Sequence, residues 1–315
     1  MSSRLQEKTI AVVVVCYNQG HFLADALDSV VAQTRPADEI ILVDDGSVDE
    51  TSHVANKYQN VRYIWQGNRG LSAARNTGLA STTSHFVLFL DSDDMLNPEA
   101  LESALAAMLA DPRCAFVYGG YRQVTTDRAE IATHNPISPC GAFDSLLRLG
   151  NYIAMHGTVL YNRTVLHDSG GFDPSLYSCE DYDVYLRLAR HHYIGTYATI
   201  AADYRCYSGS MSGKALKMAA SARAVISRHA HTTSERLLSR KGIAVMTRFY
   251  ALRYWSSVNQ NLRGCRIGSA FRNLSDLIGM PLLWRPFLTV AISHLIALGG
   301  RKITRHLRET PAPPL

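Results

Sequence analysis

The feature that most constrains the fold is an alternation of short apolar runs with helical segments along the first third of this 315-residue chain. The runs IAVVVVC at 10–16 and FVLFL at 86–90 are apolar at consecutive positions, which is typical of strands buried on both faces. Such strands need helices on both sides of the sheet. The sequence therefore predicts an α/β fold with a mixed, mostly parallel sheet flanked by helices.

The same patterns place the individual elements. We expect strands at 10–16, 39–43, 61–65, 85–90 and 115–118, and helices at 22–33, 50–58, 71–80, 98–109, 143–149 and 181–191. The polar stretch that follows residue 118, up to about Pro139, predicts a hairpin or a mobile loop. Gly170, Gly171 and Pro174 mark a turn.

The charges divide the chain into two regions. Residues 214–315 hold 17 Lys and Arg but three acids, whereas residues 1–213 hold 15 Lys and Arg and 24 acids. We therefore predict two domains, 1–213 and a helical, basic C-terminal region at 214–315, that meet different partners. The uncharged stretch Pro286–Gly300 is shorter than the roughly 18 residues that span a bilayer, so it is either an interfacial helix with a basic flank or a helix packed on its own core.

Cysteine usage and the N-terminus bear on location. The six cysteines form neither a CxxC pair nor a dense framework, which argues against a zinc site or a disulfide scaffold. The first nine residues lack a long apolar segment, so no signal peptide is indicated. A reducing, cytoplasmic location is expected.

Three of the predicted strands end in polar clusters: CYNQ at 16–19, DDGS at 44–47 and DSDD at 91–94. Ligand sites of parallel sheets lie at the carboxyl ends of strands, so these clusters are expected at one edge. Asp91 and Asp93 alternate after an apolar strand, and two carboxylates in one crevice favour a divalent cation. Oxygen ligands favour Mg²⁺ or Mn²⁺ over zinc. Taken alone, the DxD pattern also occurs in turns and helix caps.

Other motifs carry residue types suited to a nucleotide. Asp44 or Asp45 could accept the N–H of a pyrimidine ring, although the DDGS segment would equally suit an Asx turn followed by an N-cap. Arg75, on the predicted helix 71–80, carries a guanidinium suited to phosphate. Asp181, beside Glu180 at a predicted helix start, could accept a proton, although acids are also favoured at helix N-termini by the helix dipole.

Taken in order, the motifs VVVVCYNQ, VDDGS, GLSAARNTG, LDSDD and GGFD followed by ED resemble those of family 2 of the inverting nucleotide-sugar glycosyltransferases. The likeness covers roughly residues 9–212. It implies a single nucleotide-binding and catalytic domain with the Rossmann-like GT-A fold, a UDP- or dTDP-sugar donor and one divalent metal cation.

The resemblance also implies roles for individual residues. The nucleotide-binding set would be Tyr17, Asn18, Asp44, Asp45, Arg75, Asp91 and Ser92, with Asp93 as the direct metal ligand. Asp181 would be the catalytic base that deprotonates the acceptor hydroxyl during a single inverting displacement. Glu180, His156 and Tyr207 are possible acceptor or auxiliary residues, and His156 is equally compatible with a packed or surface position.

The sequence departs from the family pattern in two places. The family often carries YRxH, whose histidine reaches the metal, but residues 204–207 read YRCY, so the third ligand is open. The QxxRW motif of processive synthases is missing, which favours transfer of one sugar at a time. A lipid-linked or other saccharide acceptor is expected, with peripheral contact to the inner face of the membrane through the basic region, and no nucleic-acid partner.

Three other functions compete with this interpretation. A dinucleotide-dependent oxidoreductase lacks the GxGxxG expected after the first strand. A phosphohydrolase with Asp91 as nucleophile would leave VDDGS and the acids at 180 and 181 without a role. A sugar-nucleotide binding module without activity is suggested by the missing histidine, but Asp93 and Asp181 argue against it.

Overall fold

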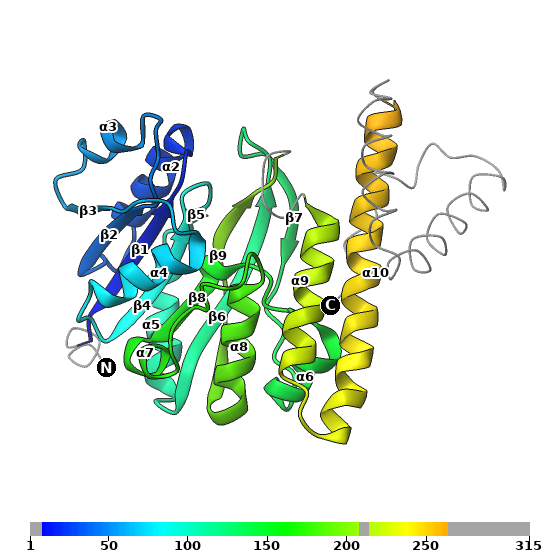
Figure 1. The fold of residues 1–315 in the computed structure, drawn as a ribbon. Helices are drawn as coiled ribbons and strands as arrows, with labels where there is room; N and C mark the ends of the chain where they lie inside the picture. Colours follow the sequence, from blue (N-terminus) through cyan, green and yellow to red (C-terminus); the bar gives the residue numbers. More distant parts are fainter. Residues whose placement is uncertain (1–7, 208–213, 264–315) are drawn as a thin grey trace. The chain divides into compact units, whose positions relative to one another are not determined.

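The computed structural model describes residues 8–207 and 214–263 of the chain (Figure 1). These residues belong to two compact units. The first comprises residues up to 143 together with 153–207, and the second comprises 144–152 together with the residues from 208 onward. The second unit thus includes the short segment 144–152 besides the C-terminal residues. The sequence-based division into domains at 213/214 stays a prediction.

The first unit is built on a single mixed sheet. Within the described residues its strand order is β3-β2-β1-β4-β8-β6-β9-β5, with β7 paired to β6. The strands are β1 (Ile10–Cys16), β2 (Glu39–Asp44), β3 (Val61–Trp65), β4 (Phe86–Asp91), β5 (Met95–Leu96), β6 (Cys114–Val124), β7 (Glu130–His134), β8 (Val159–Asn162) and β9 (Tyr193–Arg205). Strands β3, β2, β1 and β4 run parallel, as do β6 and β9, whereas β8 is antiparallel to both of its neighbours. The predicted α/β class and mixed sheet are confirmed.

Helices lie on both faces of this sheet (Figure 1). In the first unit the helices are α2 (Gly20–Val31), α3 (Thr51–Ala55), α4 (Leu71–Ala80), α5 (Ala100–Ala110), α7 (Arg163–Asp168) and α8 (Glu180–His191). The remaining helices that the structure describes are α6 (Ala142–Leu149), α9 (Ala215–Arg228) and α10 (Thr233–Arg263), which belong wholly or mostly to the second unit. The strand at 61–65 and the helix at 71–80 match their predictions. The polar stretch forms a hairpin, because β7 pairs antiparallel with β6.

Sequence patterns missed the strands β8 and β9 and the helix α7. Strand β9 mixes Thr, Gly, Asp and Ala with its apolar residues, so neither a continuous apolar run nor a clean alternation marks it. It becomes a strand because it pairs with the long strand β6, a contact between segments some 80 residues apart in the chain.

The core lies on both sides of β1, whose seven residues are all buried. Val12 and Val14 pack with Leu23 and Leu27 of α2 in one apolar cluster. Val13 points to the opposite face, where α4 approaches closely at Gly78. This two-residue alternation explains why the strand is apolar at every position.

Strand register aligns the polar clusters at one edge. Cys16 at the end of β1 pairs with Asp44 at the end of β2, and Val15 pairs with Asp91 at the end of β4. Parallel pairing therefore brings together the three polar segments that follow these strands, although they are separated by tens of residues in the chain.

The second unit contains α9 and α10 together with most of α6. Gly150 and Gly242 mark close packing within it: a Cβ at Gly150 would lie 2.3 Å from the sulfur of Met246, and one at Gly242 would lie 2.0 Å from the carbonyl oxygen of Leu147. Among the helices that the structure describes, none has the length and apolar character to cross a membrane. The uncharged stretch Pro286–Gly300 lies outside the described residues.

Gly78 offers a test of the packing between α4 and β1. A Cβ at this position would lie 2.2 Å from Cγ1 of the buried Val13. Although Ala favours helix over Gly, we expect Gly78→Ala to lower the free energy of unfolding by about 1–3 kcal/mol, because a stiff β-branched side chain must move in a packed core. Chemical denaturation checks this. Gly67→Ala, whose Cβ would meet nothing within 4 Å, is the control and should change stability little; equal stability of both variants would contradict the prediction.

Candidate active site

The first two loops at the carboxyl edge of the sheet are joined by Asn18. Its main-chain N–H donates to Oγ of Ser47 at 2.9 Å, and its Oδ1 accepts from the main-chain N–H of Val48 at 2.9 Å. Asn18 adopts a left-handed conformation with φ of 52°, which Asn tolerates better than most residues. The preceding Tyr17 keeps half of its side chain exposed. An aromatic ring is thus presented to solvent beside two fixed loops.

The two aspartates after β2 are buried and hydrogen-bonded. Asp44 accepts from the hydroxyl of Tyr63 at 2.6 Å and from the main-chain N–H of Ser47 at 2.8 Å. Asp45 accepts from the side-chain amide of Gln66 and from the main-chain N–H groups of residues 69 and 70, at 2.6 to 3.0 Å. These carboxylates shape the loop that leads into α4. Their contact with a nucleoside base stays a prediction.

Arg75 of α4 is the centre of the charged cluster. Its guanidinium, 2% exposed, donates from Nη2 to Oδ1 of Asp91 at 2.8 Å and from Nη1 to Oε1 of Glu180 at 2.6 Å. Burial alone would lower the pKa of Arg75, but the negative charges of Asp91, Glu180 and Asp181 outweigh it and raise the pKa. Arg75 thus links the end of β4 to the start of α8.

The GGFD segment at 170–173 contacts helix α4 beside Arg75. Asn76 binds the backbone of Phe172 twice, accepting from its N–H at 2.8 Å and donating to its carbonyl at 2.7 Å. The ring of Phe172 lies 5.5 Å from the guanidinium carbon of Arg75, within cation–π range. Gly171 has φ of +64°, and a Cβ there would lie 2.5 Å from Oδ1 of Asn76. The motif therefore requires a glycine so that the chain can approach α4.

Helix α8 begins at an unusual backbone position. Cys179, directly before Glu180, adopts the left-handed conformation with φ of 64°. Such a conformation is uncommon for a residue other than Gly, Asn or Asp, and it turns the chain so that acidic residues open the helix. Asp181 is half-buried, and its charge acts on the same buried Arg75 that binds Asp91. The acids after β4 and at the start of α8 are therefore brought together.

The DSDD loop holds three carboxylates close together. Burial, followed by the negative charge of Asp91, raises the pKa of Asp93, and burial, followed by the charges of Asp93 and Asp91, raises the pKa of Asp94 well above its usual value. Ionisation of Asp93 is therefore less favourable than that of a free carboxyl. Asp91 keeps about a third of its side chain exposed. Carboxylates of this kind fit a hard divalent cation such as Mg²⁺ or Mn²⁺.

The other three predicted residues lie near this cluster. Ser92 is fully buried and donates to the side-chain oxygen of Gln19 at 2.6 Å. The hydroxyl of Tyr207 donates to Oδ2 of Asp93 at 2.9 Å. His156 is buried among aromatic rings, and its Nε2 lies 3.0 Å from the hydroxyl of Tyr161. Burial, together with the charge of Arg75, lowers the pKa of His156 well below its usual value, so it is neutral. A contact of His156 with an acceptor stays a prediction.

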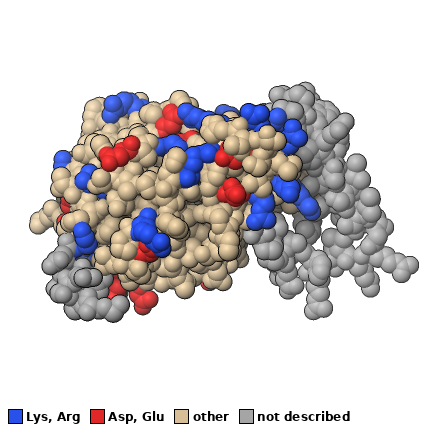
Figure 2. Space-filling view, turned by 90° about the horizontal axis from the view of Figure 1, so that it is seen from below, with Lys and Arg blue, Asp and Glu red and all other residues tan. Residues whose placement is uncertain are grey.

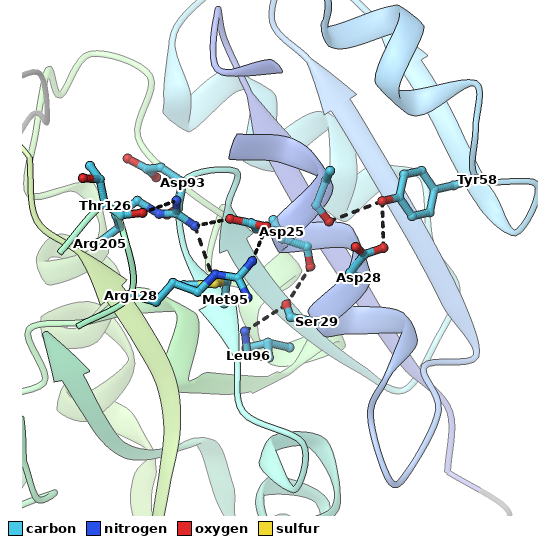
Figure 3. Close-up of polar contacts among 12 residues, drawn as sticks. Asp25, Asp28, Ser29, Tyr58, Asp93, Met95, Leu96, Thr126, Arg128 and Arg205 are labelled. Atoms are coloured by element: carbon cyan, nitrogen blue, oxygen red, sulfur yellow. Dashed lines mark hydrogen bonds and ion pairs between the residues drawn. The ribbon is translucent and has the colours of Figure 1, made fainter. Parts of the chain in front are cut away.

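Two residues that the sequence analysis left without a role, Gln19 and Arg205, hold the DSDD loop. Arg205 at the end of β9 donates from Nε to the carbonyl of Asp93 at 2.9 Å, and its main-chain N–H donates to Oδ1 of Asp94 at 2.9 Å. Its Nη2 also donates to Asp25 of α2 at 2.7 Å (Figure 3). Both residues lie within quoted motifs, CYNQ and YRCY, but only the fold shows what they contact.

In the part of the chain that the structure describes, one group of three His or acidic residues has its possible ligand atoms all within 4.8 Å of one another: His21, Asp49 and Glu50. Asp49 already accepts from the main-chain N–H of Gly20 at 2.8 Å and from the hydroxyl of Thr51 at 2.5 Å. This group is separate from the DSDD loop and is not among the predicted ligands.

Comparison with known proteins identifies the family and the fold of the chain. The sequence model of "Glycosyl transferase family 2" matches residues 11–170. An uncharacterized glycosyltransferase of Rickettsia felis is 28% identical over 188 residues, which are 58% of this chain and 31% of that protein. A chondroitin synthase of Pasteurella multocida is 29% identical over 184 residues, which are 57% of this chain and 19% of that protein. The chain thus spans a third or less of the length of these relatives.

Solved structures show the same fold. A crystal structure of S. aureus TarS, residues 1–349, in complex with UDP-GlcNAc superposes with a TM-score of 0.57 at 20% sequence identity, and the match covers 75% of this chain and 72% of that one. At this identity the likeness establishes the GT-A-type fold. Because the family model matches half of the sequence, the chain belongs to glycosyl transferase family 2.

Proposed function

We propose that the protein is an inverting glycosyltransferase that moves one sugar from a nucleotide diphosphate sugar to a hydroxyl of a saccharide or lipid-linked acceptor. The observation that carries the proposal is the pair of bonds from Arg75, 2.8 Å to Asp91 and 2.6 Å to Glu180, beside Asp181. These bonds bring the strand-end acids, which suit a metal and a diphosphate, beside a helix-start acid that suits a proton acceptor. Both sets of groups are needed for transfer to a hydroxyl.

The donor nucleoside would lie over the loops that follow β1 and β2. The exposed ring of Tyr17 offers a stacking surface, and the hydrogen bonds of Asn18 hold the two loops in place. Asp44 or Asp45 would recognise the base edge. The donor is proposed to be a UDP- or dTDP-sugar, and the TarS structure in complex with UDP-GlcNAc supports the UDP choice.

The diphosphate would lie beside the DSDD loop. Asp93, with Asp91 beside it, would hold a Mg²⁺ or Mn²⁺ ion, and Ser92 keeps the loop packed through Gln19. When bound, the cation neutralises charge that develops on the diphosphate as the bond to the sugar breaks. The raised pKa of Asp93 supports this assignment, because a cation would relieve the cost of its buried charge.

Asp181 would act as the base. Its carboxylate takes the proton of the acceptor hydroxyl while the oxygen forms a bond to the anomeric carbon, and the bond from that carbon to the diphosphate breaks on the opposite face. The electron pair of the broken bond leaves with the diphosphate, so the configuration at carbon inverts. Arg75 keeps Asp91 and Glu180 in place and offsets the negative charge around the base.

The basic region would bring the enzyme to its acceptor. The helices α9 and α10 carry nine Lys and Arg residues against one acid, Glu235. Figure 2 shows basic side chains gathered toward one end of the face in view, with acidic ones scattered. We propose that this region contacts the anionic inner face of a membrane, where a lipid-linked acceptor would be found.

Two substitutions separate the roles of the acids. We expect Asp181→Asn to keep UDP and Mn²⁺ binding but to lower the transfer rate by at least about 10²-fold, because the amide cannot accept the proton. Asp93→Ala should abolish the thermal stabilisation that Mn²⁺ adds to UDP binding. Thermal shift assays and a coupled assay for released UDP check both. Undiminished transfer in either variant contradicts the proposal.

Arg75 offers a test of positioning. Arg75→Lys keeps the positive charge but cannot bind Asp91 and Glu180 as a fork, so we expect the transfer rate to fall at least tenfold while the dissociation constant for UDP changes by less than threefold. Arg75→Met leaves the buried Glu180 unpaired and should lower the free energy of unfolding by about 3–5 kcal/mol. If Arg75 instead binds the diphosphate, Arg75→Lys will weaken UDP binding as much as it slows transfer.

A further inference from the structure

The carboxylate of Asp93 is held by two side chains from distant parts of the chain. The amide Nε2 of Gln19, after β1, donates to Oδ2 of Asp93 at 3.1 Å. The hydroxyl of Tyr207, which follows β9, donates to the same oxygen at 2.9 Å. Neither of these donors contacts Oδ1. Oδ2 of the carboxylate is therefore held by side chains from two distant parts of the chain.

The two donors are also bonded to each other. Nε2 of Gln19 donates to the hydroxyl oxygen of Tyr207 at 2.7 Å, while Oε1 of Gln19 accepts from the hydroxyl of Ser92 at 2.6 Å. The carboxylate of Asp93 can only accept, so the nitrogen end of the Gln19 amide faces it and the oxygen end is left to accept from Ser92. Gln19, Ser92, Asp93 and Tyr207 form one connected set, which we call the Asp93 clamp.

The clamp is anchored on both sides. The ring of Tyr207 packs against Phe22 of α2 with centroids 5.2 Å apart. Two residues before it, Arg205 binds the carbonyl of Asp93 and the side chain of Asp94, each at 2.9 Å. The backbone of the loop and the side chain of Asp93 are therefore both held from β9 and its extension. Neither can turn without breaking several of these bonds.

The hydroxyl of Tyr207 is already engaged as donor and as acceptor. It donates its proton to Oδ2 of Asp93 and accepts an amide proton of Gln19. These bonds favour an action of Tyr207 on a cation through the carboxylate that it orients. Hydrogen bonds to a ligating carboxylate fix its rotation and commonly decide metal affinity.

We propose that Gln19 and Tyr207 are positioning residues that hold Asp93 through Oδ2 in the orientation in which its carboxylate would bind the divalent cation, and that metal affinity depends on both. The inference rests on the proposed function, because it takes Asp93 as the metal ligand. Gln19 and Tyr207 would form a layer of residues outside the metal ligands. Tyr207 would raise the affinity for the metal without binding it directly.

The test measures Mn²⁺ binding directly, by the loss of the free-ion EPR signal in the presence of UDP, and UDP binding in EDTA. Gln19→Leu and Tyr207→Phe should each weaken Mn²⁺ binding about tenfold, the low end of the range for outer-layer substitutions. The double variant should lose less than the product of the two effects, because both donors bind one oxygen. In EDTA, the dissociation constant of each variant for UDP should stay within twofold of that of the unmodified protein. A general loss of structure would weaken UDP binding by more than this.

Tyr58→Phe is the matched control. Its hydroxyl also donates to a carboxylate, Asp28, at 2.8 Å, but on the outer surface of α2 (Figure 3). Mn²⁺ binding should be unchanged in this variant. Tyr207→Phe keeps the ring that packs on Phe22, so it removes the hydroxyl alone and its melting temperature should follow that of the control.

The outcomes separate the inference from the proposed function. If both Gln19→Leu and Tyr207→Phe bind Mn²⁺ within twofold as tightly as the unmodified protein, the clamp is overturned. The proposed function still stands in that case, because the unmodified protein binds Mn²⁺. If the unmodified protein binds no Mn²⁺ with UDP present, both fall. Equal weakening in Tyr58→Phe would show a general effect of removing a hydroxyl and would also overturn the clamp.

Discussion

The buried guanidinium of Arg75 is the interaction on which the rest of the site depends. A charge buried to this extent costs several kcal/mol unless it is paired and hydrogen-bonded. The two terminal nitrogens of Arg75 meet this requirement with Asp91 and Glu180, which come from β4 and α8. Because withdrawing either acid would leave one terminal nitrogen of this buried group unpaired, the two sides of the site are held together.

The acids at the sheet edge fall into two groups by what they bind. Asp44, Asp45 and Asp94 accept hydrogen bonds that fix loops, and each is almost wholly buried. Asp91 and Asp181 stay partly accessible, so chemistry with a ligand remains possible there. The loops are thus made rigid by one set of carboxylates so that another set can face the substrate, as preorganised sites require.

The site extends beyond the part of the chain that carries the family match. That match ends at residue 170, whereas Glu180, Asp181, Arg205 and Tyr207 all follow it. Strand β9 joins the two parts, because its pairing with β6 and with β5 carries Arg205 to the DSDD loop. Tyr207 stands at the position of the histidine in the YRxH motif described above. Its hydroxyl donates to the carboxylate of Asp93.

The sequence by itself determined the layer architecture and the edge at which the site lies, because both follow from local patterns. Continuous apolar runs predict buried parallel strands, and polar clusters after β1, β2 and β4 must meet where parallel strands end. It also selected Asp91, Asp93 and Asp181 as candidates, because the order of the motifs resembles that of the family and this resemblance implies their roles. Only the tertiary structure decided that Arg75 binds two of the acids, that His156 lies among aromatic rings, and that Gln19 and Tyr207 share one oxygen of Asp93. Arg75 and Glu180 are 105 positions apart and Asp93 and Tyr207 are 114 apart, and no local pattern encodes which distant partner a side chain will meet once strand order and register are set.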